Sequence, residues 1–208
     1  MSTNLRPLTP SDHKAAFDLV TEVFVSASTL HKALHINLEE YRTYLKASYD
    51  EMASSGLSVV AIDTETEAII GCLLGYDFHD HINNKGSVPE KFAPLSALSN
   101  ALCGSFIKER APGPRDIAYL DMAAITPAYL GQGIYQNMRT FAHTNAKELG
   151  FKSVLGELSS SITQHFVLNK MGHTKEAEVW FEQFAYNSTK PFQSIKEPKS
   201  IILAQGQL

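Results

Sequence analysis

The segment Ile125-Thr-Pro-Ala-Tyr-Leu-Gly-Gln-Gly-Ile-Tyr135 decides the fold, because it joins a strand to a helix through a turn rich in glycine. Residues 117–125 before it alternate as in a strand, with Ala118, Leu120, Met122 and Ala124 on one face and Tyr119, Asp121, Ala123 and Ile125 on the other. The helix expected at 133–149 starts with N–H groups that lack partners, and its dipole adds partial positive charge. The sequence therefore predicts an anion site at Gly131 and Gly133.

The glycine turn matches neither of two well-known phosphate-binding patterns. It has no GxGxxG, as in dinucleotide-binding domains, and no GK[ST], as in P-loops. A GxG before a helix is by itself a weak signal, and a purely structural turn is the alternative. The surrounding elements must decide between the two.

Apolar periodicity and turn residues predict a mixed sheet with helices on its faces. The expected strands are 4–8, 57–63, 68–78, 117–125, 153–158, 177–186 and 200–204, and the expected helices are 11–25, 38–56, 94–108, 133–149 and 161–171, with 31–38 as a connector. A long insert at about 79–116 interrupts this order. A connection of that length is either a lid over a functional site or decoration at the edge of the fold.

Composition narrows the class of protein. The chain has 208 residues, a formal net charge of -4, no dense Lys/Arg run and no apolar run of membrane-spanning length. We expect a single domain over 1–208 that binds neither nucleic acid nor membrane. The two cysteines, Cys72 and Cys103, form no CxxC pair, which favours a reducing, cytoplasmic setting.

The order strand, GxG turn, helix, strand, short helix, and then Lys170-Met-Gly-His173 resembles the GNAT superfamily of acyl-CoA-dependent N-acetyltransferases. The resemblance covers essentially the whole chain and is strongest between Asp121 and Phe184. The long insert and the ending Trp180-Phe-Glu-Gln-Phe184 are similar to the arylalkylamine/dopamine branch. The resemblance implies a mostly antiparallel α/β sheet that splays between 117–125 and 153–158.

The resemblance also implies an acetyl-CoA site. Its residues would be Ala124, Ile125, Leu130, Gly131, Gln132, Gly133, Ile134 and Tyr135. Two positions depart from the family pattern [Q/R]xxGx[G/A]: Leu130 replaces the polar residue and Tyr135 the final small one. Backbone N–H groups supply most of the phosphate contacts, so we expect binding to persist. Tyr135 either stacks beside the cofactor or crowds it.

In this superfamily the amine attacks the thioester directly, and a backbone N–H, here near Ala124 and Ile125, stabilises the oxyanion. The strand position of the family's carboxylate base falls at Tyr119, and Asp121 follows on the same face. We expect Asp121 to act as the base through a water relay; a structural role at the sheet rim is the alternative.

The family's acidic tyrosine corresponds to Leu168, so the usual general acid is absent. The resemblance leaves Ser160, Ser161 and His165 as candidates. Helix capping is the simpler role for the serines, and solvent exposure for His165. The pair His79 and His81 around Asp80 suggests a metal, but a solvated loop is favoured, and no metal is expected.

These inferences predict an acetyl-CoA-dependent N-acetyltransferase that acts on a small primary amine, arylalkyl or polyamine-like. A non-catalytic acyl-CoA-binding or regulatory module is the alternative, since three family side chains are missing. Acylation of a protein N-terminus is a third hypothesis, which a lid formed by the insert would disfavour. Edge strands near the C-terminus leave pairing into a homodimer open.

Overall fold

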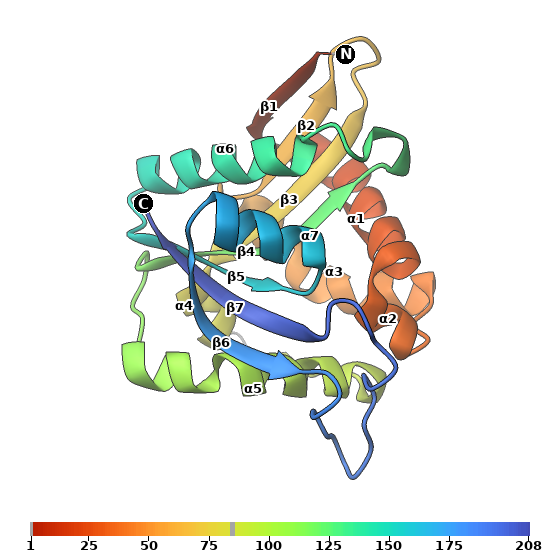
Figure 1. The fold of residues 1–208 in the computed structure, drawn as a ribbon. Coiled ribbons are helices and arrows are strands. Elements are labelled where there is room, and N and C mark those ends of the chain that lie inside the picture. The colour runs from red at the N-terminus through yellow and green to blue at the C-terminus, as the bar shows by residue number, and fades with distance from the viewer. Residues whose placement is uncertain (1, 84–85) are drawn as a thin grey trace.

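A computed structural model describes residues 2–83 and 86–208 of the chain. One seven-stranded sheet runs through the molecule in the order β1-β2-β3-β4-β5-β7-β6 (Figure 1). The strands are β1 (Thr3–Pro7), β2 (Val59–Asp63), β3 (Ile69–Asp77), β4 (Ile117–Ile125), β5 (Ser153–Leu158), β6 (Thr174–Trp180) and β7 (Ser200–Gln207). Neighbouring strands are antiparallel except β4 and β5, which are parallel. The mixed, mostly antiparallel sheet is confirmed.

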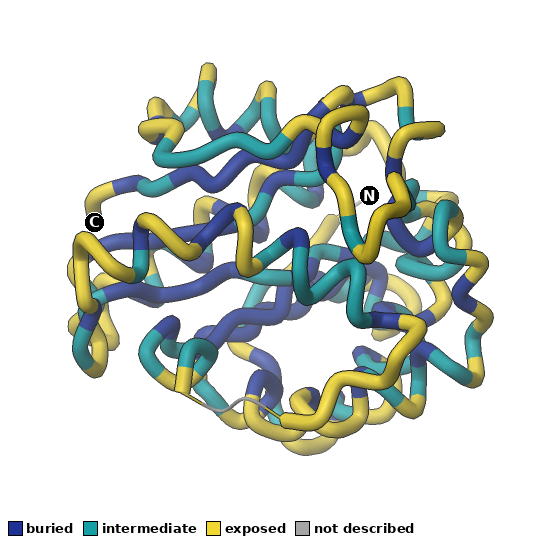
Figure 2. Tube along the Cα trace, turned by 90° about the horizontal axis from the view of Figure 1, so that it is seen from below, coloured by how far each residue is buried: buried dark blue, intermediate teal, exposed yellow. Residues whose placement is uncertain are grey.

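Helices cover both faces of the sheet. The α-helices are α1 (His13–Ala27), α2 (Thr29–Ala33), α3 (Leu38–Ser54), α4 (Phe78–Asn83), α5 (Ala93–Arg110), α6 (Ile134–Glu148) and α7 (Ser161–Gln164). Three 3₁₀ turns, η1 (Pro10–Asp12), η2 (Glu90–Phe92) and η3 (Pro127–Tyr129), and a π-helical segment, η4 (His165–Lys170), complete the list. Helices α1, α3 and α5 share one buried cluster with the sheet, and α6 packs against its other face. Figure 2 shows the buried strands between these more exposed layers. No described helix is long and apolar enough to cross a membrane.

The strand β4 contains a bulge that changes which side chains share a face. Leu74 of β3 pairs with Met122, and the next residue, Gly75, pairs with Leu120, so Asp121 is the extra residue. The regular alternation expected for 117–125 is therefore wrong beyond Asp121. Met122 and Ala124 join Ile117 and Tyr119 in the cluster with α1 and α3, and Ala123 and Ile125 join Ala118 and Leu120 toward α6.

Several element boundaries differ from the sequence-based expectation. The connector 31–38 begins inside α2, whose N-cap Ser28 accepts a hydrogen bond from the backbone of His31. The helix expected over 161–171 is a single turn of α7 continued by the wider π segment η4. The strand expected at 177–186 is β6, which starts and ends earlier. Tertiary pairing with β7, which local sequence does not encode, sets the limits of β6.

The insert 79–116 forms a packed part of the fold, except that residues 84 and 85 lie outside the described residues. Helix α5 packs against β6 and β7 and buries Leu98, Leu102, Cys103 and Phe106. Fully buried apolar side chains stabilise such a contact by roughly 2 kcal/mol each. The lid interpretation therefore does not fit α5, which covers the sheet as α1 and α3 do.

Candidate functional site

The candidate site lies where β4 and β5 separate. The two strands pair only from Ile117 to Tyr119 and from Ser153 to Leu155. Beyond these residues they diverge, so the edge of β4 from Leu120 onward has no pairing with β5 within the described chain. The splay expected between these strands is confirmed. An opening in the middle of a sheet exposes backbone groups to a ligand that enters between the strands.

Asp121 stands at the bulge of β4, directly beside this opening. Burial, and next the negative charge of Glu157, raise the pKa of Asp121 to about 7; a hydrogen bond from Tyr76 opposes the shift. A carboxyl group with a pKa near neutrality can accept and release a proton under ordinary conditions. Asp121 is therefore suited to act as a general base.

Tyr76 and His81 connect Asp121 to the outside of the sheet. The Tyr76 hydroxyl, on β3, bonds to Asp121 and lies 2.5 Å from Nδ1 of His81, on α4. When Asp121 is ionised, Tyr76 donates to its carboxylate and accepts from His81. When Asp121 is protonated, its O–H donates to Tyr76, whose own proton points to His81. The three groups can thus pass a proton toward His81, which is only partly buried.

Glu157 supplies a second carboxylate on the same face. It follows Gly156 on β5 and accepts hydrogen bonds from the Ser99 hydroxyl at 2.5 Å and the Cys103 thiol at 3.3 Å. Both donors belong to α5, so the insert builds one wall of the site. Two carboxyl groups across the strand opening favour a cationic ligand between them.

Aromatic side chains surround this carboxylate pair. The Tyr44 and Phe92 rings stack with centroids 4.1 Å apart, and the buried Tyr41 stacks on Phe92 at 6.5 Å. The Tyr41 hydroxyl donates to Sδ of Met122, next to Asp121. The charge of Asp121 contributes to raising the pKa values of Tyr41 and Tyr44, after burial as the main cause. Flat apolar walls next to buried carboxylates suit an organic amine.

The glycine turn forms the other half of the candidate site, at the start of α6. Gly131 and Gly133 have φ values of +79° and +76°, which L side chains rarely adopt. No side chain caps the helix, whose N-cap is Gly133. A Cβ at Gly131 would meet nothing within 4 Å, so the turn is open. These free N–H groups fit the pyrophosphate of acetyl-CoA.

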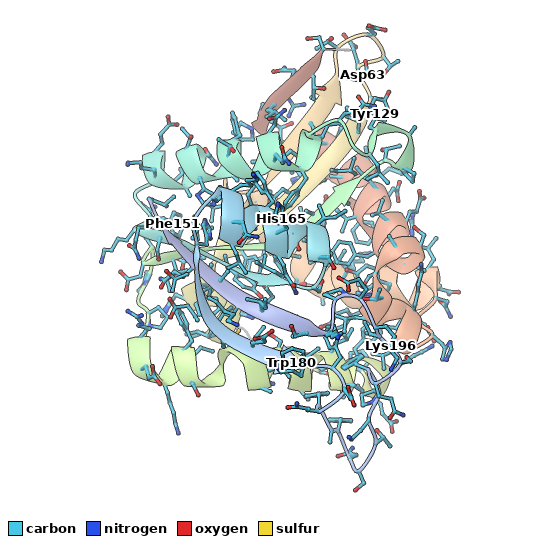
Figure 3. The ribbon with its side chains drawn as sticks, viewed as in Figure 1. Asp63, Tyr129, Phe151, His165, Trp180 and Lys196 are labelled. Atoms are coloured by element: carbon cyan, nitrogen blue, oxygen red, sulfur yellow. The ribbon has the colours of Figure 1, made fainter. Side chains whose placement is uncertain are left out.

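A hydrogen bond anchors the turn to the sheet. The Tyr129 hydroxyl, in η3, donates to Oδ2 of Asp63 at the end of β2 over 2.7 Å, and Figure 3 labels both residues. Leu130 and Tyr135, the two residues that depart from the family pattern, take no part in this hydrogen bond. Leu130 is 63% exposed, whereas the Tyr135 ring packs edge-on against Phe166 of η4 at 5.8 Å. Tyr135 thus connects α6 to η4.

The structure separates the predicted catalytic residues. The Tyr119 ring is buried beside Tyr76 and His81, and negative charge from Glu157 and Asp121 adds to burial in raising its pKa. Ser160 caps α7 by accepting from the backbone N–H of Thr163. Ser161 donates to Glu197, and the exposed His165 pairs with Asn169 at 3.0 Å (Figure 3).

Consequently Tyr119 and Asp121 share a site, while the recorded partners of Ser160, Ser161 and His165 belong to other parts of the fold. Of the residues expected to bind acetyl-CoA, Ala124 and Ile125 end β4, and 130–135 form the turn and the first residues of α6. His79 and His81 lie on α4 rather than in a loop. Among the described residues, no three His, Cys, Asp or Glu side chains are grouped to hold a metal ion.

Sequence reasoning missed Tyr76, Glu157 and Ser99. Tyr76 and Glu157 stand in strands where an isolated polar group reads as an outward-facing residue. Ser99 lies in a helix that was expected to be an edge or a lid. A carboxylate in a strand whose neighbours are all apolar is the one signal that could have found Glu157.

Searches by sequence found no matching family model and no matching curated protein. Solved structures do match over the full chain. The C-terminal condensation domain of Ebony, in complex with β-alanyl-dopamine, aligns with a TM-score of 0.88 at 17% identity, covering all of both chains. Arylalkylamine N-acetyltransferase 2 from Aedes aegypti aligns with a TM-score of 0.81 at 12% identity, covering 100% of this chain and 99% of that one.

A third neighbour is the Drosophila melanogaster polyamine N-acetyltransferase, which catalyses the formation of N-acetylagmatine. It aligns with a TM-score of 0.77 at 11% identity, covering all of both chains. At such identities the likeness concerns the backbone. The chain therefore has the GNAT fold, in the form found in arylalkylamine and polyamine N-acetyltransferases.

Proposed function

We propose that the protein is an acetyl-CoA-dependent N-acetyltransferase that acetylates a small primary amine, arylalkyl or polyamine-like. The observation that carries the proposal is Asp121, a carboxyl group with a pKa near 7, placed at the bulge of β4 beside the opening in the sheet. The open glycine turn follows the end of β4 and precedes α6, where it would take the pyrophosphate of the acetyl donor.

In this mechanism acetyl-CoA supplies the thioester, and residues of the chain position and deprotonate the amine. Asp121 takes the proton of the attacking amine, directly or through water, as the amine nitrogen bonds to the acetyl carbon, and Tyr76 and His81 lead that proton outward. The thioester C–S bond then breaks, and coenzyme A leaves as a thiolate that takes a proton from water. Glu157 and the aromatic wall of Tyr41, Tyr44 and Phe92 hold the amine. The unpaired edge of β4 provides backbone N–H groups for the oxyanion, expected near Ala124 and Ile125.

The test is a screen of amines with acetyl-CoA, run with Asp121→Asn beside the wild type. We expect turnover whose kcat/KM rises with pH through about 7, because the base must be ionised. Asp121→Asn should lower kcat about 10²- to 10⁴-fold and remove that limb of the profile. The kcat of Tyr76→Phe should lie between that of the wild type and that of Asp121→Asn. Asp50→Asn, which changes an exposed aspartate on α3, is the matched control.

Binding of acetyl-CoA without turnover of any amine would favour the alternative, a non-catalytic acyl-CoA-binding module. The donor panel should include a β-alanyl thioester, because β-alanyl-dopamine is the molecule bound to the structurally similar Ebony domain. Transfer of β-alanyl but not acetyl groups would show that the protein acylates an amine but that acetyl-CoA is not its donor. Equal activity of Asp121→Asn and the wild type would contradict the role given to Asp121.

A further inference from the structure

A buried arginine lies on the α6 side of the opening between β4 and β5. Arg139, on α6, is only 2% exposed. A Cβ on Gly156 would lie 3.1 Å from its Nη2 atom and 3.1 Å from the carbonyl oxygen of Leu120, so the guanidinium occupies the space above this glycine. Burying such a charge without a partner is unfavourable, because the guanidinium loses its hydration. The arrangement therefore calls for a compensating group.

The described residues do not supply that group. Nε and Nη2 of Arg139 have no hydrogen-bond partner within the described chain. Burial lowers the pKa of Arg139, and the interaction with the Tyr135 hydroxyl, including a hydrogen bond, opposes this change. Among the described residues, no carboxylate contributes to the pKa of Arg139. Nε and Nη2 share one edge of the planar guanidinium. That edge binds two oxygens of a carboxylate or phosphate at once.

Two histidines extend this cluster. The His143 and His173 rings lie with centroids 5.0 Å apart, and the His173 ring fills the space that a side chain at Gly206 would need. His143 Nε2 and His173 Nδ1 are also buried without partners among the described residues. Burial, with Arg139 as the next cause, lowers the pKa of His143 to about 3 and of His173 to about 4. At neutral pH Arg139 thus carries the charge of the cluster.

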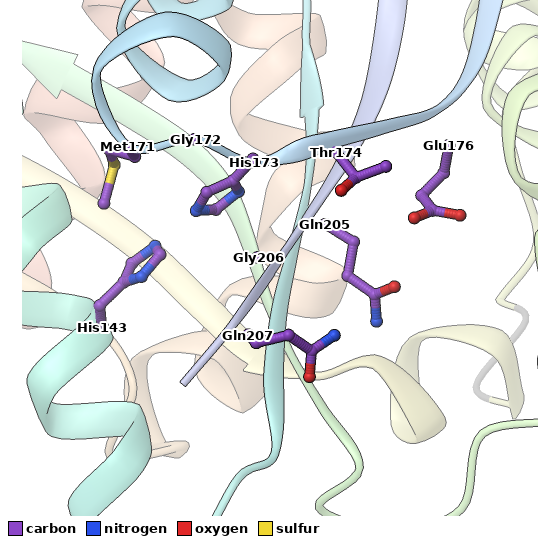
Figure 4. A pocket seen from close by; sticks show the side chains of 9 residues that line it. All are labelled: His143, Met171, Gly172, His173, Thr174, Glu176, Gln205, Gly206 and Gln207. Carbon is purple, nitrogen blue, oxygen red and sulfur yellow. The ribbon is translucent and has the colours of Figure 1, made fainter.

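A pocket of about 340 Å³ opens onto the two histidines (Figure 4). Farther along, the pocket is lined by the polar side chains of Thr174, Gln205 and Gln207. At its other end, Oε2 of Glu176 lies 3.5 Å from Nη2 of Arg110. This volume lies within the range of small-molecule sites. A ligand that enters here meets hydroxyl and amide groups first and the histidines last. Arg139 does not line the pocket; it lies behind the histidines, close enough for its charge to lower the pKa of both.

We propose that Tyr135, Arg139, His143 and His173 form a binding site, the Arg139 site, for one carboxylate or phosphate group of a small polar ligand. The unpaired guanidinium edge takes two oxygens of that group, and the histidine N–H groups take the others. Glycines at 156 and 206 make room for the guanidinium and one imidazole, so two strands are shaped around the site. The site lies on the α6 face of the sheet, opposite to the face that carries the aromatic wall near Asp121.

Calorimetric titration of the intact protein tests the proposal, with inorganic phosphate, succinate and the uncharged succinamide at constant ionic strength. We expect phosphate or succinate to bind with one-to-one stoichiometry and succinamide not to bind. Arg139→Leu should weaken that binding at least tenfold and should leave the ligand-free protein at least as resistant to heat as the wild type. Arg115→Leu, which removes an exposed arginine, should bind as the wild type does.

Arg139→Lys keeps the positive charge but lacks the guanidinium edge that binds two oxygens at once. This variant replaces Arg139→Leu if Arg139→Leu does not fold. It too should bind the anion at least tenfold more weakly than the wild type. Repeating the titration with saturating acetyl-CoA distinguishes two sources of the anionic group. Unchanged binding assigns the site to a free small anion, and competition assigns it to the donor molecule. Absence of binding by both anions in the wild type, or equal binding by the Arg139 variants, would overturn the proposal.

Discussion

At the scale of single residues, Asp121 links function to stability. Its pKa is about 7 in the folded protein, compared with about 3.9 in an unfolded chain. Between these values the folded state keeps a proton that the unfolded state has lost, so stability falls as pH rises through this window. We predict that Asp121→Asn is more stable than the wild type at pH 8, by on the order of 1.4 kcal/mol for each pH unit between the two pKa values. Near pH 4 the difference should be small.

Urea unfolding at pH 4 and pH 8 measures this difference. Asp50→Asn, the exposed control on α3, should show little change at either pH. A gain in stability that is the same at both pH values would mean that the asparagine packs better, and that the proton on Asp121 is not the cause.

Individual site residues could be predicted only where their own segment carries the signal. Asp121 is a carboxylate in an apolar strand, and this pattern, together with the position that the family resemblance gives to the base, makes it a candidate. Its neighbours on the same face depend on a bulge, which is set by the pairing of Gly75 with Leu120 and not by the sequence of β4. Arg139 reads as a surface residue of α6, since its burial rests on the missing side chain of Gly156 in another strand.

At the scale of elements, α5 is the clearest departure from expectation. Within α5, the Leu102 side chain is only 1% exposed, and the Ser99 hydroxyl donates a hydrogen bond to Glu157. We predict that Leu102→Ala destabilises the protein by about 2–5 kcal/mol, as for other buried leucines. Leu130→Ala, at an exposed leucine, should cost far less. Backbone amides of α5 should exchange with deuterium as slowly as those of β6 and β7, whereas a mobile lid would exchange within seconds.

Elements with strong local periodicity were predicted well. The limits of β4 and β5 are as expected, and Asn37 caps α3 with Glu40 in a reciprocal capping box. The π segment η4 and the limits of β6 were not predictable, because the pairing of β6 with β7 is a tertiary contact, and no local pattern marks the change from α7 to η4.

At the scale of the whole molecule, the sheet divides the candidate chemistry between its two faces. One face, covered by α3 and α5, carries Asp121, Glu157 and the aromatic wall. The other face is covered by α6, which contains Arg139 and begins at the glycine turn. The opening between β4 and β5 joins the two faces. The splay was implied by the resemblance to the GNAT superfamily, which rests on the glycine turn and its flanking elements. The fold could therefore be predicted, and the facing side chains could not.

This division predicts that substitutions on each face change one Michaelis constant. Gly131→Val forces a β-branched residue into a φ of +79° at the turn, so the KM for acetyl-CoA should rise about tenfold or more while the KM for the amine stays within about twofold. Tyr44→Ala removes a stacked wall ring, and it should raise the KM for the amine and spare that for acetyl-CoA. Gly104→Ala, in an open part of α5, should change neither constant. Steady-state kinetics with each substrate varied in turn measures all three variants, and a rise of both constants in both site variants would show that donor and acceptor are not held on separate faces.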